Sequence, residues 1–162
     1  SFSVLDEYLR AEMVELVRRL HWENGLTSVV VTHDKQEALK FSDRIVLMSG
    51  GRILQQDSPR EIFRHPVNRE AAEFFGRMNY IQSGEEVIGV RPFDIRILPA
   101  GEDCMVKAIS FMGETAEVIL DTPKGEIFCT AVSGTLEELG LVPGSRVGME
   151  IKSGSGLSVR VP

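Results

Sequence analysis

Few features of this sequence point to an oxidising compartment or to a membrane. Cysteine occurs twice, at Cys104 and Cys129, and neither residue belongs to a CxxC or Cys/His spacing. We therefore expect no disulfide framework, and we interpret both cysteines as small buried apolar residues of a cytoplasmic protein. No apolar run approaches the ~20 residues that a membrane-spanning helix needs, and no signal-peptide pattern opens the chain. The sequence predicts a soluble protein.

An excess of basic residues is also missing. The chain holds 18 Lys and Arg against 24 Asp and Glu, a formal net charge of −6. Residues 80–162 contain 7 basic and 12 acidic residues, with few aromatic side chains for stacking on bases. Because proteins that bind nucleic acids usually present a basic face, often with aromatic residues, we expect no nucleic-acid partner.

Motifs for phosphate and metal chemistry are scarce. Neither Gly-Lys-Ser nor Gly-Lys-Thr occurs, so the sequence has no P-loop, and we expect no metal site. Of the three histidines, His33 is the strongest candidate. It follows an apolar run and precedes a helix start, a place where anions are often bound. The alternative is a turn histidine bonded to a backbone carbonyl, and His21 and His65 are interpreted as structural.

The composition changes near the middle of the chain. Residues 1–79 carry 4 of the 15 glycines and residues 80–162 carry the other 11, which suggests two domains of different class with a boundary between Gly76 and Gly84. In the first part, helical spacing and β-branched runs predict an α/β domain. The expected elements are a helix from the Ser3–Asp6 capping pattern to Asn24-Gly25, buried parallel strands at Ser28–Thr32 and Arg44–Met48 joined by a helix capped by Asp34, a hairpin strand at Ile53–Gln56, a helix capped by Ser58 and a helix at about Arg69–Gly76.

Apolar residues in the second part recur at every other position, as in a β-strand with one buried face. Turn residues separate these segments. The expected strands include Glu114–Asp121, Ile127–Ala131, Val147–Ile151 and Leu157–Val161. Five or six short strands with one apolar face are expected to curl into a small barrel, which avoids open sheet edges.

Several short motifs occur together in a fixed order and spacing. They are Phe2–Asp6, Val31–Asp34, Ala38, Ser42–Ile45, Gly51–Ile53, Gln56, Ser58–Glu61 and Pro66. In this arrangement they resemble the C-terminal part of the ATP-binding subunit of an ABC transporter of the importer type. Gly89–Pro92 and the strands beyond it resemble the appended regulatory barrel called TOBE. The resemblance implies an α/β fragment of a P-loop NTPase domain over residues 1–79 and an all-β, OB-like small barrel over residues 80–162.

The resemblance also implies roles for particular residues. Ser3, Leu5 and Asp6 match the D-loop, which crosses the interface between two ATP-binding domains, although Val4 replaces the usual alanine. His33 matches the switch histidine, which contacts the γ-phosphate of ATP and supports its hydrolysis.

Partners and cofactors follow from the same resemblance. It implies a parent ATPase that uses ATP and Mg²⁺, works as a homodimer with transmembrane permease subunits on the inner face of the cell membrane, and couples hydrolysis to solute uptake. The P-loop, Walker B strand, Gln loop and signature motif of the family are absent, so the sequence looks like a fragment that begins just after Walker B. We expect this fragment to hold no cofactor and to be inactive. The alternative is a stand-alone regulatory or dimerisation module without catalysis.

Two arginines are further candidate site residues, and the apolar strands of the first part are a candidate surface for association. Arg91 and Arg96, near the start of the expected barrel, are interpreted as an anion site or as a contact that docks the barrel on the first part, the alternative being ordinary salt bridges. The expected strands of the first part are apolar on both faces. Because uncovered apolar edges invite association, we also expect the chain to self-associate through its first part.

Overall fold

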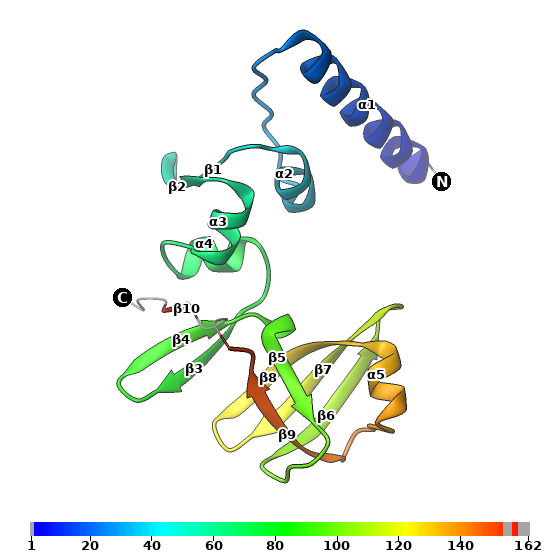
Figure 1. Cartoon of the computed structure of the whole chain (residues 1–162), viewed down its shortest axis with the longest axis vertical. Helices are drawn as coiled ribbons and strands as arrows, with labels where there is room; N and C mark the ends of the chain where they lie inside the picture. Colours follow the sequence, from blue (N-terminus) through cyan, green and yellow to red (C-terminus); the bar gives the residue numbers. More distant parts are fainter. Residues whose placement is uncertain (1, 154–156, 159–162) are drawn as a thin grey trace.

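The computed structural model describes the backbone of residues 2–153 and 157–158, and the side chains of Leu9 and of residues 12–153. Over these residues the chain contains five α-helices, one 3₁₀ turn and ten strands (Figure 1). None of the helices within the described ranges is both long and apolar enough to cross a membrane.

The first element is a long helix, α1 (Phe2–Asn24), which stands apart from the remaining elements in Figure 1. Gly25 follows it with a φ of +60°, the left-handed conformation that ends many helices. The predicted end of this helix is therefore confirmed. Its predicted start is wrong, because an N-cap residue needs an extended backbone, whereas Ser3 already lies inside the helix.

The segment Ser28–Thr32 does not form the predicted buried strand. It has no secondary structure, and Val29 and Val31 are 90% and 96% exposed. A strand needs a neighbour that pairs with its backbone N–H and C=O groups. No strand within the described residues pairs with this segment, and the predicted parallel partner forms an antiparallel pair elsewhere. The parallel arrangement predicted from the sequence is thus not present in this structure.

The next elements follow the local sequence signals closely. Helix α2 (Lys35–Phe41) is capped by Asp34, as predicted. Strands β1 (Ile45–Ser49) and β2 (Arg52–Asp57) form an antiparallel hairpin. Gly50 and Gly51 make its turn with φ values of +54° and +75°, the combination that tight hairpin turns require and glycine adopts without strain.

Two short helices cover one face of this hairpin. Helix α3 (Pro59–Arg64) begins with Ser58 as cap and Pro59 at its first position, as predicted, and helix α4 (Arg69–Phe74) is capped by Asn68. Their buried residues join the inner face of β1 in one small core. Its members are Ile45, Leu47, Ile62 and Ala71, with Ala38, Leu39, Leu54, Phe74 and Phe75 packed against them. The outer face of the hairpin, which includes Val46, Met48 and Ile53, is exposed.

The second part consists of strands with one short α-helix. The predicted strands Glu114–Asp121, Ile127–Ala131 and Val147–Ile151 are confirmed, and Leu157–Ser158 of the fourth is a strand, whereas residues 159–161 lie outside the described residues. The sequence analysis did not locate β3 to β6 or α5. The elements are β3 (Asn79–Ser83), β4 (Glu86–Val90), the 3₁₀ turn η1 (Pro92–Asp94), β5 (Ile95–Leu98), β6 (Cys104–Phe111), β7 (Thr115–Thr122), β8 (Gly125–Val132), α5 (Ser133–Glu138), β9 (Arg146–Ile151) and β10 (Leu157–Ser158).

These strands form two sheets. A three-stranded sheet has the order β10-β4-β3, and a five-stranded sheet has the order β5-β9-β6-β7-β8. The larger sheet curls in Figure 1, and its two edge strands, β5 and β8, contribute to the same core, although within the described residues they are not hydrogen-bonded to each other.

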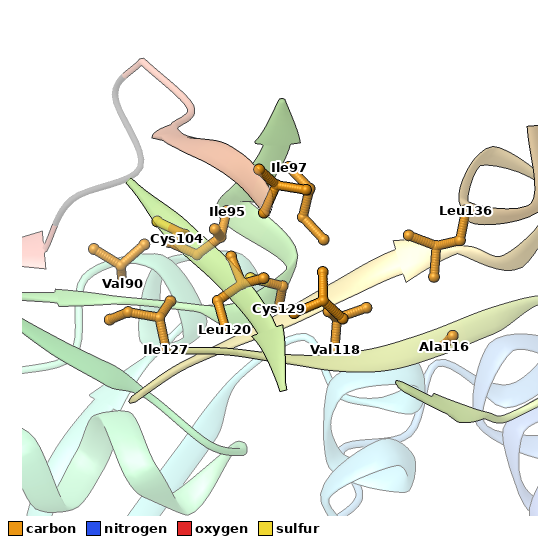
Figure 2. Packing of buried hydrophobic residues seen from close by; sticks show 12 residues of the cluster. Val90, Ile95, Ile97, Cys104, Ala116, Val118, Leu120, Ile127, Cys129 and Leu136 are labelled. Carbon is orange, nitrogen blue, oxygen red and sulfur yellow. The ribbon is translucent and has the colours of Figure 1, made fainter. Parts of the chain in front are cut away.

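One apolar core holds the second part together (Figure 2). Leu120, Val106 and Val147 are fully buried in it. Both cysteines also lie in this core as free thiols, which confirms their interpretation as buried apolar residues. Burial is the main cause that raises the pKa of the Cys129 thiol to about 12, so this thiol stays protonated near neutral pH.

The close approach of Gly101 to Gly148 generates a stability prediction. A Cβ atom on Gly101 would lie 2.4 Å from both Cα and N of Gly148, which is backbone of β9 and cannot move aside easily. We expect Gly101→Ala to destabilise the chain by about 1–3 kcal/mol, the usual cost of overpacking. The measurement is guanidinium unfolding followed by circular dichroism.

Gly134→Ala is the matched control. Gly134 lies in α5, and a Cβ atom there would meet nothing within 4 Å. Because alanine favours helix by up to about 1 kcal/mol over glycine, this substitution should be neutral or stabilising. Equal unfolding midpoints for the two variants would contradict the packing argument.

Candidate functional site

His33 lies just before α2, in a backbone segment that its neighbours hold in place. The Asp34 carboxylate accepts hydrogen bonds from the backbone N–H groups of Gln36 and Glu37, at 2.8 and 3.1 Å. The Thr32 hydroxyl donates to the Glu37 carboxylate at 2.8 Å and accepts the Asp34 N–H at 3.0 Å. The residues on both sides of His33 are therefore anchored to the first turn of α2.

The His33 imidazole itself is exposed. It makes no hydrogen bond or ion pair with any described residue, and this differs from the alternative of a turn histidine bonded to a backbone carbonyl. In contrast, His21 has a described partner, the Ser28 hydroxyl at 3.1 Å, and His65 lies 3.8 Å from the Glu61 carboxylate. The His33 side chain is thus open to an external ligand, although it is not at the end of a buried strand as the sequence suggested.

The three D-loop candidates lie in the N-terminal part of α1. The backbone of Ser3, Leu5 and Asp6 is helical. Their side chains lie outside the described residues, so their role at a dimer interface stays a prediction.

Arg91 lies at the junction between the two parts of the chain. Arg91 directly follows β4, and it is 7% exposed. It donates one hydrogen bond to the carbonyl of Phe63 at 3.1 Å and one to the carbonyl of Ala72 at 3.4 Å. Its guanidinium carbon lies 3.9 Å from the centre of the Phe63 ring. The carbonyls belong to α3 and α4, so this one cation contacts both helices.

The electrostatics of Arg91 follow from this burial. Desolvation lowers the pKa of Arg91, while the charge of Asp94 and then Tyr80 act in the opposite direction. No carboxylate forms a salt bridge with Arg91 within the described residues. Two carbonyl dipoles, an aromatic face and the nearby charge of Asp94 therefore stabilise this cation.

The sequence analysis missed further residues at the same junction. The Tyr80 hydroxyl donates to Glu73 at 2.9 Å, and the Arg69 guanidinium donates to the same carboxylate at 2.7 Å and lies 4.2 Å from the centre of the Tyr80 ring. The hydrogen bond from Arg69 is the main cause that lowers the pKa of Glu73, and burial is the main cause that raises the pKa of Tyr80 to about 12. These contacts join α4 to β3.

Asn79 makes a second connection, this time between β3 and β8. Its side chain donates to the carbonyl of Phe128 and accepts the Phe128 N–H, both at 2.8 Å. Arg77 lies over the Phe128 ring at 4.1 Å. Asn79 and Tyr80 lie inside the predicted boundary region between Gly76 and Gly84, and this position is a sequence signal that points to the junction.

Arg96 is placed differently from Arg91. It is exposed on β5 and donates to the Glu150 carboxylate on β9 at 2.9 Å. This salt bridge links two strands of one sheet and does not reach the first part. As for metals, no group of three or more His, Cys, Asp or Glu side chains in the described part of the chain could hold a metal ion.

Comparison with known proteins gives several relatives, whereas no model of a protein family matches the chain. The sulfate/thiosulfate import ATP-binding protein CysA of Vibrio cholerae is 48% identical over 92 residues, 54% of this chain and 24% of that protein. The sn-glycerol-3-phosphate import ATP-binding protein UgpC 1 of Rhizobium johnstonii is 36% identical over 147 residues, 85% of this chain and 39% of that protein. The Fe(3+) ions import ATP-binding protein FbpC of Escherichia coli is 31% identical over 151 residues, 77% and 43% of the two chains. The chain spans less than half the length of each of these relatives.

Among solved structures, the cytoplasmic molybdate-binding protein ModG is similar at a TM-score of 0.41 and 24% identity. The similarity covers 46% of this chain and 61% of that one. It is too low to carry an argument about fold or ligand.

The junction generates a prediction about Arg91. Arg91→Ala removes the described donor to two carbonyls and the cation stacked on Phe63, so we expect a loss of at least about 2 kcal/mol in the free energy of unfolding. Arg96→Ala removes an exposed salt bridge, which is worth about 0–1 kcal/mol. Urea unfolding of the two variants measures the difference. A smaller loss for Arg91→Ala than for Arg96→Ala would refute the assigned contact.

Proposed function

The chain is homologous to part of the ATP-binding subunits of ABC importers, and we propose that it works as the C-terminal portion of such a subunit, in which ATP binding and hydrolysis drive solute uptake. The observation that carries the proposal is the match to UgpC 1, because it extends over 147 residues and so includes sequence from both parts of the chain. The relatives named above import chemically different solutes. Their shared segment therefore concerns the use of ATP more than the choice of solute.

Within this proposal, residues 1–79 are the C-terminal part of an ABC nucleotide-binding domain and residues 80–162 are a TOBE-like regulatory domain. We assign His33 as the switch histidine and Ser3, Leu5 and Asp6 to the D-loop. The exposed imidazole of His33, next to a backbone anchored by Thr32 and Asp34, supports the first assignment. Arg91 serves as the docking residue between the two domains, which is supported by its contacts with Phe63 and Ala72.

The proposal also includes partners and place. The subunit would pair with a second copy and with transmembrane permease subunits on the inner face of the cell membrane. The names of the relatives, all import ATP-binding proteins, support this.

The residues of this chain do not by themselves fit an ATP site. No Gly-Lys-Ser or Gly-Lys-Thr occurs to cradle phosphates. His33 is the single phosphate-facing candidate of the proposal, and one exposed imidazole is a weak anion site in water. The ATP and Mg²⁺ of the proposal therefore need sequence that this chain does not contain.

This mismatch predicts how the isolated chain behaves with nucleotide. Titration of the 162-residue chain with MgATP, followed by calorimetry, should show no binding in the micromolar range, and phosphate release should equal the buffer blank. A micromolar dissociation constant would show that the chain holds a nucleotide site of another kind.

A chimera tests the proposed activity directly. The chain replaces the matched segment of UgpC 1 of Rhizobium johnstonii, which supplies the rest of an ATP-binding protein. We expect the chimera to hydrolyse ATP and His33→Ala to lower kcat at least about a hundredfold, as expected for loss of a group that stabilises charge on the phosphate.

His65→Ala is the matched control, because His65 is an exposed histidine that follows α3 and whose side chain lies near the Glu61 carboxylate of that helix. It should leave kcat within about twofold. A folded chimera that does not hydrolyse ATP would instead favour a regulatory or dimerisation module without catalysis. Unchanged kcat in His33→Ala would remove the catalytic assignment alone.

A further inference from the structure

We propose that the second part of the chain carries a binding site for a small organic cation, in an apolar cleft beside α5. The cleft consists of two adjoining hollows with volumes of about 630 and 370 Å³, which share Phe111, Ser133 and Glu137. Volumes of this size are typical of sites for small molecules. The site lies far along the chain from His33 and does not depend on the proposed ATPase function.

Several large apolar side chains that line the cleft are exposed. Phe93 and Phe111 are 55% and 72% exposed, and Val132 and Val142 are exposed as well. Phe93 and Val132 line the larger hollow, Val142 lines the smaller one, and Phe111 lines both. Exposed aromatic and aliphatic side chains gathered around a concavity commonly mark a ligand site.

The charges in the cleft select the ligand class. Glu114 and Glu137 line it, and neither carboxylate forms a salt bridge with the described cations. Neither hollow has a Lys, Arg or His side chain among its lining residues. In contrast, Glu150 on the same part of the chain is paired with Arg96. An apolar cleft with unmatched negative charge complements a ligand that has apolar carbon and positive charge.

The aromatic rings favour the same ligand. The Lys152 ammonium lies 4.5 Å from the centre of the Phe93 ring and donates to the Phe93 carbonyl at 2.7 Å. The ammonium of the chain itself therefore already occupies the Phe93 ring, and the ring left to a ligand cation is Phe111. The Phe111 ring has no such partner among the described residues, and it lies in both hollows. An ammonium group is attracted to the face of an aromatic ring, and it also forms charge-assisted hydrogen bonds with carboxylates.

The test is a titration of the 162-residue chain with 1,5-diaminopentane at physiological salt, followed by two-dimensional ¹H–¹⁵N NMR. Its control ligand is 1,5-pentanediol, which has the same carbon chain without charge. We expect saturable shifts of amide signals around Gly113, Ser133 and Glu137 with the diamine and none with the diol. Binding of the diol with equal affinity, or shifts that spread over the whole acidic surface without saturation, would overturn the proposal.

Variants localise the effect. Glu137→Gln should weaken binding of the diamine at least about fivefold, and Phe111→Ser should do the same because it removes the exposed ring. Glu117→Gln is the matched control, since Glu117 is an exposed acid on β7 that lines neither hollow, and its effect should stay below twofold. Equal weakening by Glu117→Gln and Glu137→Gln would refute the site. A change of oligomeric state in Phe111→Ser, measured by sedimentation, would show that a second copy covers the cleft and would also overturn the proposal.

Discussion

A single buried guanidinium connects the two parts of this chain. Arg91 leaves the β-rich part and ends between α3 and α4, where two backbone carbonyls and the Phe63 ring surround it. The guanidinium forms no salt bridge with a described carboxylate, so these groups, together with the nearby charge of Asp94, replace the water that it loses on burial. The contacts of this one charged side chain therefore constrain the position of α3 and α4 relative to β4. The interlocked Tyr80, Glu73 and Arg69 side chains add a second, more exposed connection.

At this junction, helices α3 and α4 contact both parts of the chain. Helices α3 and α4 contribute Ile62 and Ala71 to the core of the β1–β2 hairpin, and they also receive Arg91 from the other side. They form a layer that contacts both parts. A displacement of the β-rich part would therefore reach the hairpin through these helices more easily than through the chain connection alone.

The elements that the sequence predicted well are those with local signals. Asp34 and Ser58 cap their helices through their own side chains, and Gly50-Gly51 makes its turn through its own backbone freedom. Each signal needs only a few neighbouring residues. The predicted strand at Ser28–Thr32 failed because a strand depends on a partner that the local sequence does not contain. The valines of this segment are exposed, and the self-association expected for this part stays a prediction.

Two misses in the second part have different physical causes. The register of β6 shifts between Val106 and Ala108, so the alternation of buried and exposed residues breaks within the strand and hides it from a period-two pattern. Helix α5 is only six residues long, too short to show a helical period, and its Ser133-Gly134 start resembles a turn. The sequence analysis offered Arg91 as a docking contact between the two parts, but it could not identify the partners of Arg91 and Asn79, because these partners are up to 49 residues away.

Neighbouring side chains hold the backbone around His33, while the His33 side chain itself takes no part in these contacts. Thr32, Asp34 and Glu37 use their side chains to fix the backbone around the histidine. The histidine contributes nothing to this network, and its imidazole stays exposed. Because the backbone on both sides of His33 is already fixed, ordering the imidazole on a ligand would cost side-chain entropy only. His33 differs in this respect from His21 and His65, whose side chains contact neighbouring residues.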